Sequence, residues 1–349
     1  MIYINGRFLS QKLTGVNRVA YELCNALFLL KVEFVIIAPR KILIEYDISN
    51  FNIIYWGIGK SHFWDQLSLP FFFLLKKKYL LINFSGLGTL LLKKQFLTIH
   101  DMSFWRHPEW FSKIYFYYYK ALTPIVARRA LHILTVSEFS RKEIIDCLKV
   151  DESKVSVVYN AVSQQFINKN INIKNESKTV EYILAVSSID PRKNFLRLLS
   201  AVNLLDTKVK LVIIGNSNSV FQNIDLNYSE RVNFLGHVSD DQLRMYYSNA
   251  KLFVYPSVYE GFGLPPLEAM AMSCPTVVSD IKVFNEVFGD ATKYFDPYDV
   301  DDIARCINQV LKSKEIQEEL ISKGLELVNK YSWQNSAQKL VHIIEKIRL

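Results

Sequence analysis

Short apolar runs of strand type alternate with amphipathic helix patterns along nearly the whole chain, and this alternation most constrains the fold. Strands separated by helices need crossover connections, which predicts a mostly parallel sheet with helices on both faces. In the first half the strand patterns span residues 2–4, 33–38, 53–56, 80–83, 96–99, 132–136 and 155–158, and the helix patterns span 16–30, 110–129 and 138–148.

A polar segment at residues 160–178, rich in Asn, Gln, Ser and Lys, interrupts the alternation and is typical of an interdomain linker. A chain of 349 residues is also longer than one hydrophobic core usually serves. We therefore predict an α/β protein with two Rossmann-like domains and a cleft between them. The second alternation has strands at 182–186, 210–214, 232–235, 252–255, 276–279 and 293–295, and helices at 194–205, 240–249, 266–273, 300–311 and 333–347.

Residues 259–271, Tyr-Glu-Gly-Phe-Gly-Leu-Pro-Pro-Leu-Glu-Ala-Met-Ala, join a strand pattern to a helix pattern in the second half. In an open α/β sheet such junctions lie at the carboxyl edge, where ligands bind and the new helix presents unpaired N–H groups to an anion. Gly261 and Gly263 let the backbone approach a ligand closely. The alternative is an ordinary turn, with Glu260 a solvated loop residue and Glu268 an acid favoured by the helix dipole.

This segment resembles the Glu-x7-Glu signature of retaining glycosyltransferases of family 4, which have the two-domain GT-B fold. The resemblance implies that Glu260 contacts the transferred hexose and that Glu268 accepts hydrogen bonds from the nucleotide ribose. It also implies that the backbone N–H groups of Phe262, Gly263 and Leu264 hold sugar hydroxyls. The domains it predicts are an acceptor-binding domain at 1–165, a nucleotide-sugar-binding domain at 166–332, and a helix at 333–349 that returns to the first domain.

Arg192 and Lys193 follow the strand pattern at 182–186 and precede a helix pattern. A leaving nucleoside diphosphate gains negative charge, so cations fixed at this edge can act as the electrophilic catalyst. The family has a Lys at the position of Lys193, usually with an Arg six residues earlier that grips the same diphosphate. Ser187 occupies that earlier position here, so we assign the second cation to Arg192. The alternative, an exposed Arg-Lys pair in a first helical turn, is disfavoured by the helix dipole.

His100 and Asp101 end a strand pattern in the first half, so we expect them to face the cleft. The family places a His after this strand near the hexose. Gly15 lies in a turn that opens a helix and matches the N-terminal glycine loop of the family, with Arg18 nearby. Val238, after Gly236 and His237, matches the position where the nucleotide base rests against backbone.

The Asp-x-Asp sequence at Asp299 and Asp301 directly precedes a helix pattern, where a helix N-cap and first-turn acids explain it. We therefore expect no metal and no cofactor other than the donor nucleotide. The four cysteines are scattered, as is typical of reduced cytosolic thiols. The N-terminus lacks the pattern of a signal peptide, and no apolar run is long enough to span a membrane.

The net charge of +8 is concentrated where basic residues punctuate aromatic stretches, at residues 67–96 and 110–130. This composition is found at monotopic membrane faces, although core elements with charged flanks would give the same pattern. No nucleic-acid-binding module accompanies the charge, so nucleic acid is not an expected partner.

We therefore predict a cytoplasmic hexosyltransferase, peripheral at the inner face of the bacterial membrane. Its expected reaction transfers a hexose, with retention and without metal, to a polyprenyl-diphosphate-linked glycan of O-antigen or lipopolysaccharide type. GDP-mannose is the favoured donor, because residues 189–194 and His100-Asp101 resemble mannosyltransferases of polysaccharide clusters. The alternatives are a UDP-sugar donor, a GT-B epimerase or phosphorylase, and a non-catalytic subunit that binds sugar nucleotides.

Overall fold

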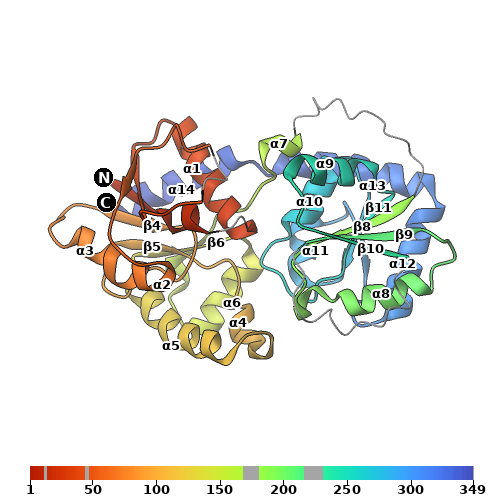
Figure 1. Ribbon diagram of the computed structural model, residues 1–349, viewed down its shortest axis with the longest axis horizontal. Helices are drawn as coiled ribbons and strands as arrows, with labels where there is room; N and C mark the ends of the chain where they lie inside the picture. Colours follow the sequence, from red (N-terminus) through yellow and green to blue (C-terminus); the bar gives the residue numbers. More distant parts are fainter. Residues whose placement is uncertain (12–13, 44–46, 168–180, 216–230, 349) are drawn as a thin grey trace. The chain divides into compact units, whose positions relative to one another are not determined.

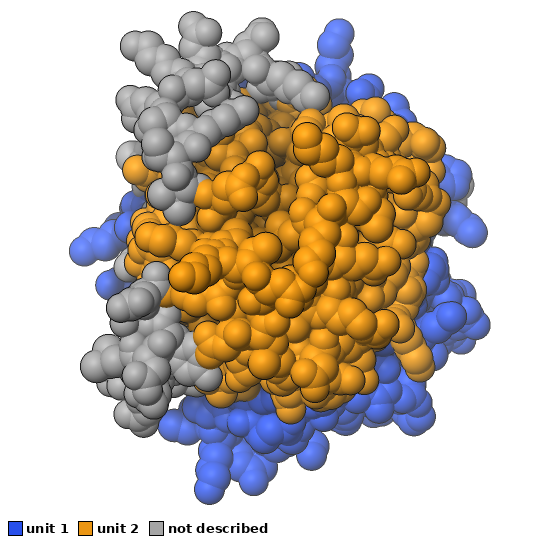
Figure 2. Space-filling model, turned by 90° about the vertical axis from the view of Figure 1, so that its right-hand side faces the viewer, with its two compact units in different colours: residues 1–160, 333–349 blue, residues 161–332 orange. Residues whose placement is uncertain are grey.

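The computed structural model describes residues 1–11, 14–43, 47–167, 181–215 and 231–348. The chain forms two compact units, shown in different colours in Figure 2: unit 1 contains residues 1–160 and 333–349, and unit 2 contains residues 161–332. The division after Asn160 lies close to the boundary that the sequence places after residue 165. Most of the expected linker, residues 168–178, lies outside the described residues.

Unit 1 contains, in its described part, a seven-stranded parallel sheet of order β3-β2-β1-β4-β5-β6-β7. The order reverses between β1 and β4, which is the kind of switch point where ligands bind in open α/β sheets. Its strands are β1 (Ile2–Asn5), β2 (Phe34–Ala38), β3 (Ile53–Tyr55), β4 (Leu80–Asn83), β5 (Gln95–Thr98), β6 (His132–Thr135) and β7 (Val155–Val157).

Helices cover both faces of this sheet, with α1 and α14 on one face and α5 and α6 on the other (Figure 1). Helix α14 packs against α1, and Ser336 Oγ donates to the carbonyl of Tyr159 at 2.6 Å, so the C-terminal helix belongs to unit 1. The helices are α1 (Gly15–Leu29), α2 (Ser61–Phe63), a π-helical turn (Trp64–Ser68), α3 (Leu69–Phe73), α4 (Ser103–Arg106), α5 (Lys113–Arg129), α6 (Glu138–Leu148) and α14 (Trp333–Arg348), with 3-10 turns at Gly6–Ser10, Pro108–Trp110 and Glu152–Lys154.

Unit 2 contains, among its described residues, a six-stranded parallel sheet of order β10-β9-β8-β11-β12-β13. The order reverses between β8 and β11, so the carboxyl ends of these two strands lie side by side. The strands are β8 (Tyr182–Val186), β9 (Lys210–Ile214), β10 (Val232–Gly236), β11 (Leu252–Tyr255), β12 (Thr276–Ser279) and β13 (Lys293–Phe295).

Helices α8 and α12 pack on one face of the unit 2 sheet, while α9 and α10 lie on the other (Figure 1). Asp299 Oδ1 accepts from the backbone N–H groups of Asp301 at 2.9 Å and Asp302 at 3.2 Å, so the predicted N-cap is confirmed. The helices are α7 (Gln164–Ile167), α8 (Phe195–Asn203), α9 (Asp240–Asn249), α10 (Leu264–Ala271), α11 (Lys282–Phe288), α12 (Val300–Lys312) and α13 (Lys314–Lys330), with a 3-10 turn at Pro191–Lys193.

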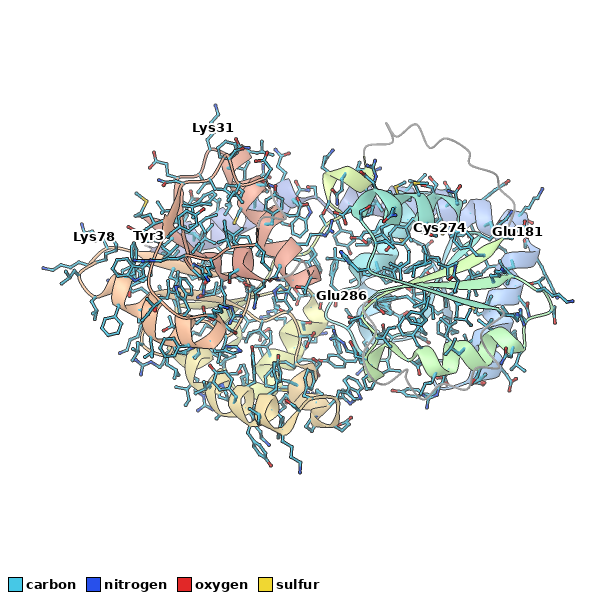
Figure 3. The ribbon with its side chains drawn as sticks, in the orientation of Figure 1. Tyr3, Lys31, Lys78, Glu181, Cys274 and Glu286 are labelled. Atoms are coloured by element: carbon cyan, nitrogen blue, oxygen red, sulfur yellow. The ribbon has the colours of Figure 1, made fainter. Side chains whose placement is uncertain are left out.

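Among the described residues, no helix combines the length and the apolar character needed to cross a bilayer. The four cysteines, all among the described residues, are free thiols; Cys274 is one of the buried ones (Figure 3).

Candidate active site

Lys193, Tyr255 and Glu260 form one buried cluster at the carboxyl edge of the unit 2 sheet. The ammonium of Lys193 contacts Glu260 Oε1 and donates to the hydroxyl of Tyr255 at 3.0 Å. That hydroxyl in turn donates to Glu260 Oε1 at 2.9 Å. Lys193 comes from the 3-10 turn after β8, whereas Tyr255 ends β11 and Glu260 follows it, so the adjacency of β8 and β11 makes the cluster.

The electrostatics of the cluster favour an ionised Glu260. Burial has the largest single effect and would raise the pKa of Glu260, but the charges of Lys193 and Arg192 and the hydrogen bond from Lys193 together hold this pKa below its ordinary value. Lys193 is 5% exposed and Glu260 is 8% exposed. The alternative readings of Glu260 as a solvated loop residue and of Lys193 as an exposed first-turn cation are therefore wrong.

The loop that carries Arg192 and Lys193 is tied to the loop after β11. The backbone N–H of Val258 donates to the carbonyl of Arg192 at 2.8 Å. Arg192 is itself paired with Asp190, with Nε 3.3 Å from Oδ1. The predicted helix start at Asn194 is displaced slightly, because Asn194 adopts the left-handed conformation between the 3-10 turn and α8.

The glycine turn before α10 has a conformation that requires glycine. Gly263 has φ of 112° and stands at the N-cap of α10. A Cβ there would lie 2.8 Å from Phe288 Cζ and 3.1 Å from Phe284 Cε1, within a packed aromatic cluster. Phe262 is buried with its ring 5.5 Å from that of Tyr331, so this residue can offer a ligand only its backbone. Leu264 is the first residue of α10.

Glu268 is the fifth residue of α10 and is 7% exposed, so it is not the first-turn acid favoured by the helix dipole that the alternative reading supposed. The hydroxyl of Tyr247, on α9, donates to Glu268 Oε2 at 3.1 Å. The structure thus places both glutamates of the Glu-x7-Glu segment in buried, hydrogen-bonded environments.

Backbone contacts at the ends of β8, β9 and β10 complete this edge of unit 2. The N–H of Ser187 donates to the carbonyl of Ile214 at 3.0 Å, and the N–H of Gly215 donates to that of Gly236 at 2.8 Å. A Cβ on Gly215 would stand 1.8 Å from the carbonyl oxygen of Ser187, so the two backbones are in direct contact. Val238 follows Gly236 in this region and is partly exposed.

In unit 1, His100 follows β5 and lies 2.8 Å from the carbonyl oxygen of Phe84 through Nε2. A carbonyl only accepts, so Nε2 carries the proton and Nδ1 has the free lone pair. Burial lowers the pKa of His100, despite opposing contributions from Phe84 and Asp101, so the ring is neutral at pH 7.

Asp101 has a local structural task that the sequence pattern did not reveal. Its Oδ1 accepts from the N–H of Ser103 at 2.8 Å and from the hydroxyl of Ser103 at 2.5 Å, which holds the start of α4.

Gly15 is the first residue of α1, and a Cβ there would meet nothing within 4 Å, so packing does not demand a glycine. Arg18, one turn along the same helix, is half-buried.

Sequence reasoning missed the polar residues that support these side chains. Tyr255 and Tyr247 are two of them, and an aromatic residue with a hydroxyl at the end of a buried strand is the only signal that pointed to Tyr255. Sequence reasoning also missed a buried ion pair in unit 1, in which Arg7 Nη1 lies 2.6 Å from Asp65 Oδ2. Burial raises the pKa of Asp65 to about 6, although Arg7 opposes the shift.

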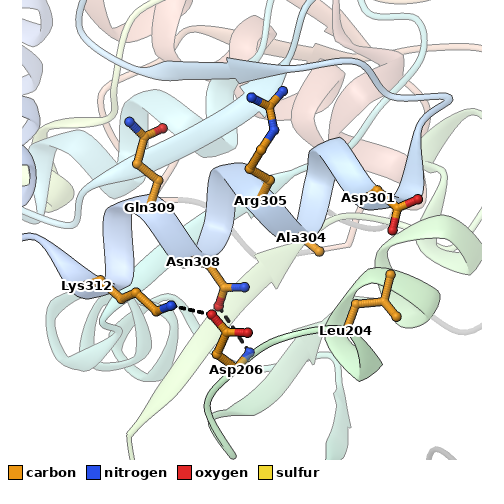
Figure 4. Close-up of a pocket in the computed structure, with 8 residues that line it drawn as sticks. All are labelled: Leu204, Asp206, Asp301, Ala304, Arg305, Asn308, Gln309 and Lys312. Atoms are coloured by element: carbon orange, nitrogen blue, oxygen red, sulfur yellow. Dashed lines mark hydrogen bonds and ion pairs between the residues drawn. The ribbon is translucent and has the colours of Figure 1, made fainter.

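A surface hollow lies between α8 and α12, at Leu204, Asp206, Asp301, Ala304, Arg305, Asn308, Gln309 and Lys312 (Figure 4). The side chains of Asp206 and Lys312 form an ion pair across it. It shares no residue with the predicted site, and it is therefore not the candidate active site. Within the described parts of the chain, no three His, Cys, Asp or Glu side chains gather as metal ligands.

Two family models cover most of the chain. Residues 13–166 match the model described as Glycosyltransferase Family 4, and residues 166–326 match the model described as Glycosyl transferases group 1. The chain is 34% identical over 254 residues to the O-antigen chain mannosyltransferase RfbU of Salmonella typhimurium, covering 71% of this chain and 68% of that protein. It is 33% identical over 266 residues to the O-antigen chain mannosyltransferase B of Escherichia coli, covering 72% and 70% respectively.

Solved structures with low sequence identity share the fold. The sucrose-phosphate synthase of Thermosynechococcus elongatus superposes with a TM-score of 0.78 at 16% identity, covering 99% of this chain and 98% of that one. WaaG, a glycosyltransferase involved in lipopolysaccharide biosynthesis, superposes with a TM-score of 0.75 at 12% identity and covers 99% of both chains. With the two family models and the alignments to mannosyltransferases, these results establish that the chain is an enzyme of the glycosyltransferase family 4 type with the GT-B fold.

Proposed function

We propose that this glycosyltransferase is a retaining, metal-independent hexosyltransferase that moves mannose from GDP-mannose to a polyprenyl-diphosphate-linked glycan in bacterial O-antigen synthesis. The observation that carries the proposal is the buried cluster of Lys193, Tyr255 and Glu260, which puts a cation and a carboxylate at one point of the sheet edge. The mannosyltransferase names of the relatives support the choice of sugar.

Lys193 and Arg192 would bind the diphosphate. An ammonium has three N–H donors, and Lys193 uses two of them on Tyr255 and Glu260, which leaves one for a phosphate oxygen. The charge on that oxygen grows as the leaving group departs, so a cation fixed beforehand stabilises the transition state more than the ground state. This stabilisation would replace the divalent metal that other transferases use.

Glu260 would bind the hexose and Glu268 the ribose of the nucleotide. Tyr255 and Lys193 both contact Oε1 of Glu260, so the second carboxylate oxygen is not used by this pair. The N–H groups of Phe262, Gly263 and Leu264 belong to the turn before α10 and would hold sugar hydroxyls, while Val238 would face the base. In unit 1, the neutral His100 would bind near the hexose, and Asp101 and Gly15 would complete the site on that unit.

The reaction needs no protein nucleophile. The bond between the anomeric carbon and the diphosphate oxygen breaks, and its electron pair leaves on the nucleoside diphosphate. The acceptor hydroxyl oxygen then bonds to the same face of that carbon, and its proton passes to the departing diphosphate. The products are the glycoside and the protonated nucleoside diphosphate, so atoms and charge balance.

The acceptor proposal draws on an apolar tip at the end of α3 and just after it, defined by Phe71, Leu74, Leu75, Lys77 and Lys78. Leu75 is 96% exposed, Leu74 is 70% exposed and Phe71 is 62% exposed. Lys78 stands at the outer end of this segment (Figure 3). Apolar side chains beside lysines suit an anionic bilayer, which would hold the enzyme at the cytoplasmic face near a lipid-linked acceptor.

Other parts of the basic and aromatic stretches are core with charged flanks. Phe96 is wholly buried in β5 and Leu92 is buried in the core of unit 1, so neither side chain can reach a bilayer. Lys76 lies 4.8 Å from the ring centre of Phe72 and 5.4 Å from that of Tyr3, where it covers the core of unit 1. The membrane proposal therefore rests on the apolar tip and does not extend to all the clusters that the sequence suggested.

Co-sedimentation with liposomes tests the membrane proposal. Reversal of Lys78 to Glu removes about 2 kcal/mol of attraction to an anionic surface, so binding should weaken roughly thirty-fold. Leu75→Ser should weaken binding to the same liposomes by removing an inserted side chain. Lys31→Glu, an exposed lysine elsewhere on unit 1, is the matched control and should bind like the parent (Figure 3). Equal binding by all variants, or equal binding to neutral liposomes, would show that the apolar tip does not bind an anionic bilayer.

A thermal-shift screen of GDP, UDP and TDP, each with and without an attached sugar, tests the donor. GDP and GDP-mannose should raise the melting temperature, and the uridine and thymidine compounds should not. Stabilisation by UDP sugars alone would identify a UDP sugar as the donor in place of GDP-mannose, and the proposed hexosyl transfer would be unchanged. Isomerisation of the sugar nucleotide without an acceptor would indicate an epimerase.

A further inference from the structure

Each glutamate of the Glu-x7-Glu segment receives a hydrogen bond from a buried tyrosine that lies outside the segment. The hydroxyl of Tyr255 lies 2.9 Å from Glu260 Oε1, and the hydroxyl of Tyr247 lies 3.1 Å from Glu268 Oε2. Tyr255 is 2% exposed and Tyr247 is 0% exposed. Water therefore has little access to either hydroxyl, and a carboxylate that loses its tyrosine partner would keep an unfilled acceptor site.

Both tyrosines stay protonated, so both act only as fixed donors to these carboxylates. Burial first, and the neighbouring glutamate second, raise the pKa of each phenol well above its ordinary value. Tyr255 ends β11 and Tyr247 lies on α9, which are regular elements with rings packed against Phe253 at 6.0 Å and 5.5 Å. Each hydroxyl is thus placed by a rigid element, whereas Glu260 lies in a loop.

Tyr255 also connects Lys193, the proposed diphosphate-binding residue, to Glu260, the proposed hexose-binding residue. An ammonium can only donate, so the hydrogen bonds run from Lys193 to the Tyr255 hydroxyl and from that hydroxyl to Glu260. Tyr247 donates to Glu268, the other glutamate of the segment. The two tyrosines therefore act on different parts of the donor.

We propose that Tyr255 and Tyr247 are positioning residues, of which Tyr255 orients Glu260 and Lys193 for sugar transfer and Tyr247 orients Glu268 for nucleotide binding. The inference rests on the roles proposed above for the two glutamates. Its distinctive consequence is that two chemically identical changes, Tyr255→Phe and Tyr247→Phe, affect different kinetic quantities.

The experiment compares these two variants with Tyr182→Phe, which loses a hydroxyl that donates to the carbonyl of Tyr246 at 2.8 Å in the same unit and contacts neither glutamate. The rate of GDP release from GDP-mannose gives kcat and KM, and calorimetry with GDP gives Kd; UDP-glucose and UDP replace them if the donor screen selects uridine. A hydrogen bond to a charged group is worth about ten- to a hundred-fold.

Tyr255→Phe should lower kcat by about ten- to a hundred-fold. The Kd of GDP should change by about two-fold or less, because Lys193 keeps its contact with Glu260. Tyr247→Phe should raise Kd and KM by a comparable factor with kcat nearly unchanged, because only the ribose contact is disturbed. Tyr182→Phe should match the parent in all three quantities.

The pH dependence of kcat separates positioning from packing. Glu260 is faced by Lys193 and Arg192 from the turn after β8 and by Tyr255 from β11, and Arg192 is paired with Asp190. A donor to a carboxylate favours its ionised form, so its removal should move the acid limb of the profile to higher pH in Tyr255→Phe alone. A residue that only filled space would lower the melting temperature and leave the limb in place.

Parent-like kcat, Kd and acid limb in both Phe variants would overturn the inference, and an inactive Lys193 variant would show that the proposed site still holds. If both variants had equally lowered kcat, equally weakened GDP binding and lowered melting temperatures, the tyrosines would have only a packing role, and the inference would also be overturned. Parent-like donor binding by Lys193 and Glu268 variants would instead refute the proposed site itself.

Discussion

Replacement of Lys193 by Met removes the ammonium from the buried cluster while keeping a side chain of similar length. Lys193 and Glu260 are 5% and 8% exposed, so the carboxylate left behind cannot recover its hydration. Breaking a buried ion pair by removing one partner costs about 3–5 kcal/mol, and we expect the lower end because Arg192 remains near Glu260. The Kd of GDP should rise roughly ten- to a hundred-fold, since one charged hydrogen bond to the diphosphate is lost.

The pH dependence of this loss has a definite sign. In the parent, the pKa of Glu260 is lower in the folded state than its ordinary value of 4.5, so the stabilisation is present above that value and is lost as pH falls through the folded pKa. In Lys193→Met the lowering charge is gone and burial dominates, which raises the folded pKa. The variant should therefore lose additional stability as pH rises from about 5 to 7, whereas the parent should not.

Urea unfolding at pH 5 and pH 7, together with calorimetry of GDP, measures both effects. The matched control is the double variant Lys193→Met with Glu260→Gln, which removes both charges and should recover most of the lost stability at pH 7 without recovering GDP affinity. A single variant as stable as the parent at both pH values would refute a buried pair. Unchanged affinity for GDP would refute the contact between Lys193 and the diphosphate.

Three further predictions follow from the same site. Transfer should survive excess EDTA, because Lys193, Arg192 and helix N–H groups supply the positive charge; complete loss restored by Mn²⁺ would contradict this. Gly263→Ala should lower the free energy of unfolding by about 2 kcal/mol in urea titrations and weaken donor binding, because its φ of 112° and the rings of Phe284 and Phe288 exclude a Cβ; parent-like stability would contradict it. Asp101→Ala should lower stability by about 1 kcal/mol through the start of α4, whereas Asp101→Asn, which keeps Oδ1, should fold like the parent; identical melting curves for the two would remove the structural task assigned to that oxygen.

The strands were the most predictable part of the fold. Strands of a parallel sheet are buried on both faces, so they appear in the sequence as continuous apolar runs. Each run can be identified without knowing which strand it pairs with. The predicted runs at 182–186, 210–214 and 276–279 coincide with β8, β9 and β12. Helix α9 was equally clear, because Ser239 and Gln242 form a capping box at its start.

The helical elements between residues 61 and 73 and at Lys314–Lys330 were missed for opposite reasons. The segment from Leu69 to Leu75 is apolar all round and includes exposed side chains, so it shows no helical period, and a π-helical turn precedes it. Helix α13 is charged along most of its length and buries few side chains, among them Leu320 and Val328. A narrow buried stripe gives too few apolar positions to set a period.

The site was predictable as separate motifs and not as an arrangement. Lys193 and Glu260 are 67 residues apart, and each could be recognised only from its own strand-to-helix junction. Their contact depends on the sheet order, in which β11 pairs with β8 although β9 and β10 lie between them in the sequence. Local patterns do not fix that order, because β8 and β9 are both continuous apolar runs and either could be the neighbour of β11. Once β8 and β11 are adjacent, the turn after one and the loop after the other must meet at the carboxyl edge, and the cation and the carboxylate neutralise each other there. The same adjacency explains why Tyr255 could not be assigned a role from the sequence. Its role depends on its hydrogen bonds to Lys193 and Glu260, which are far apart in the sequence.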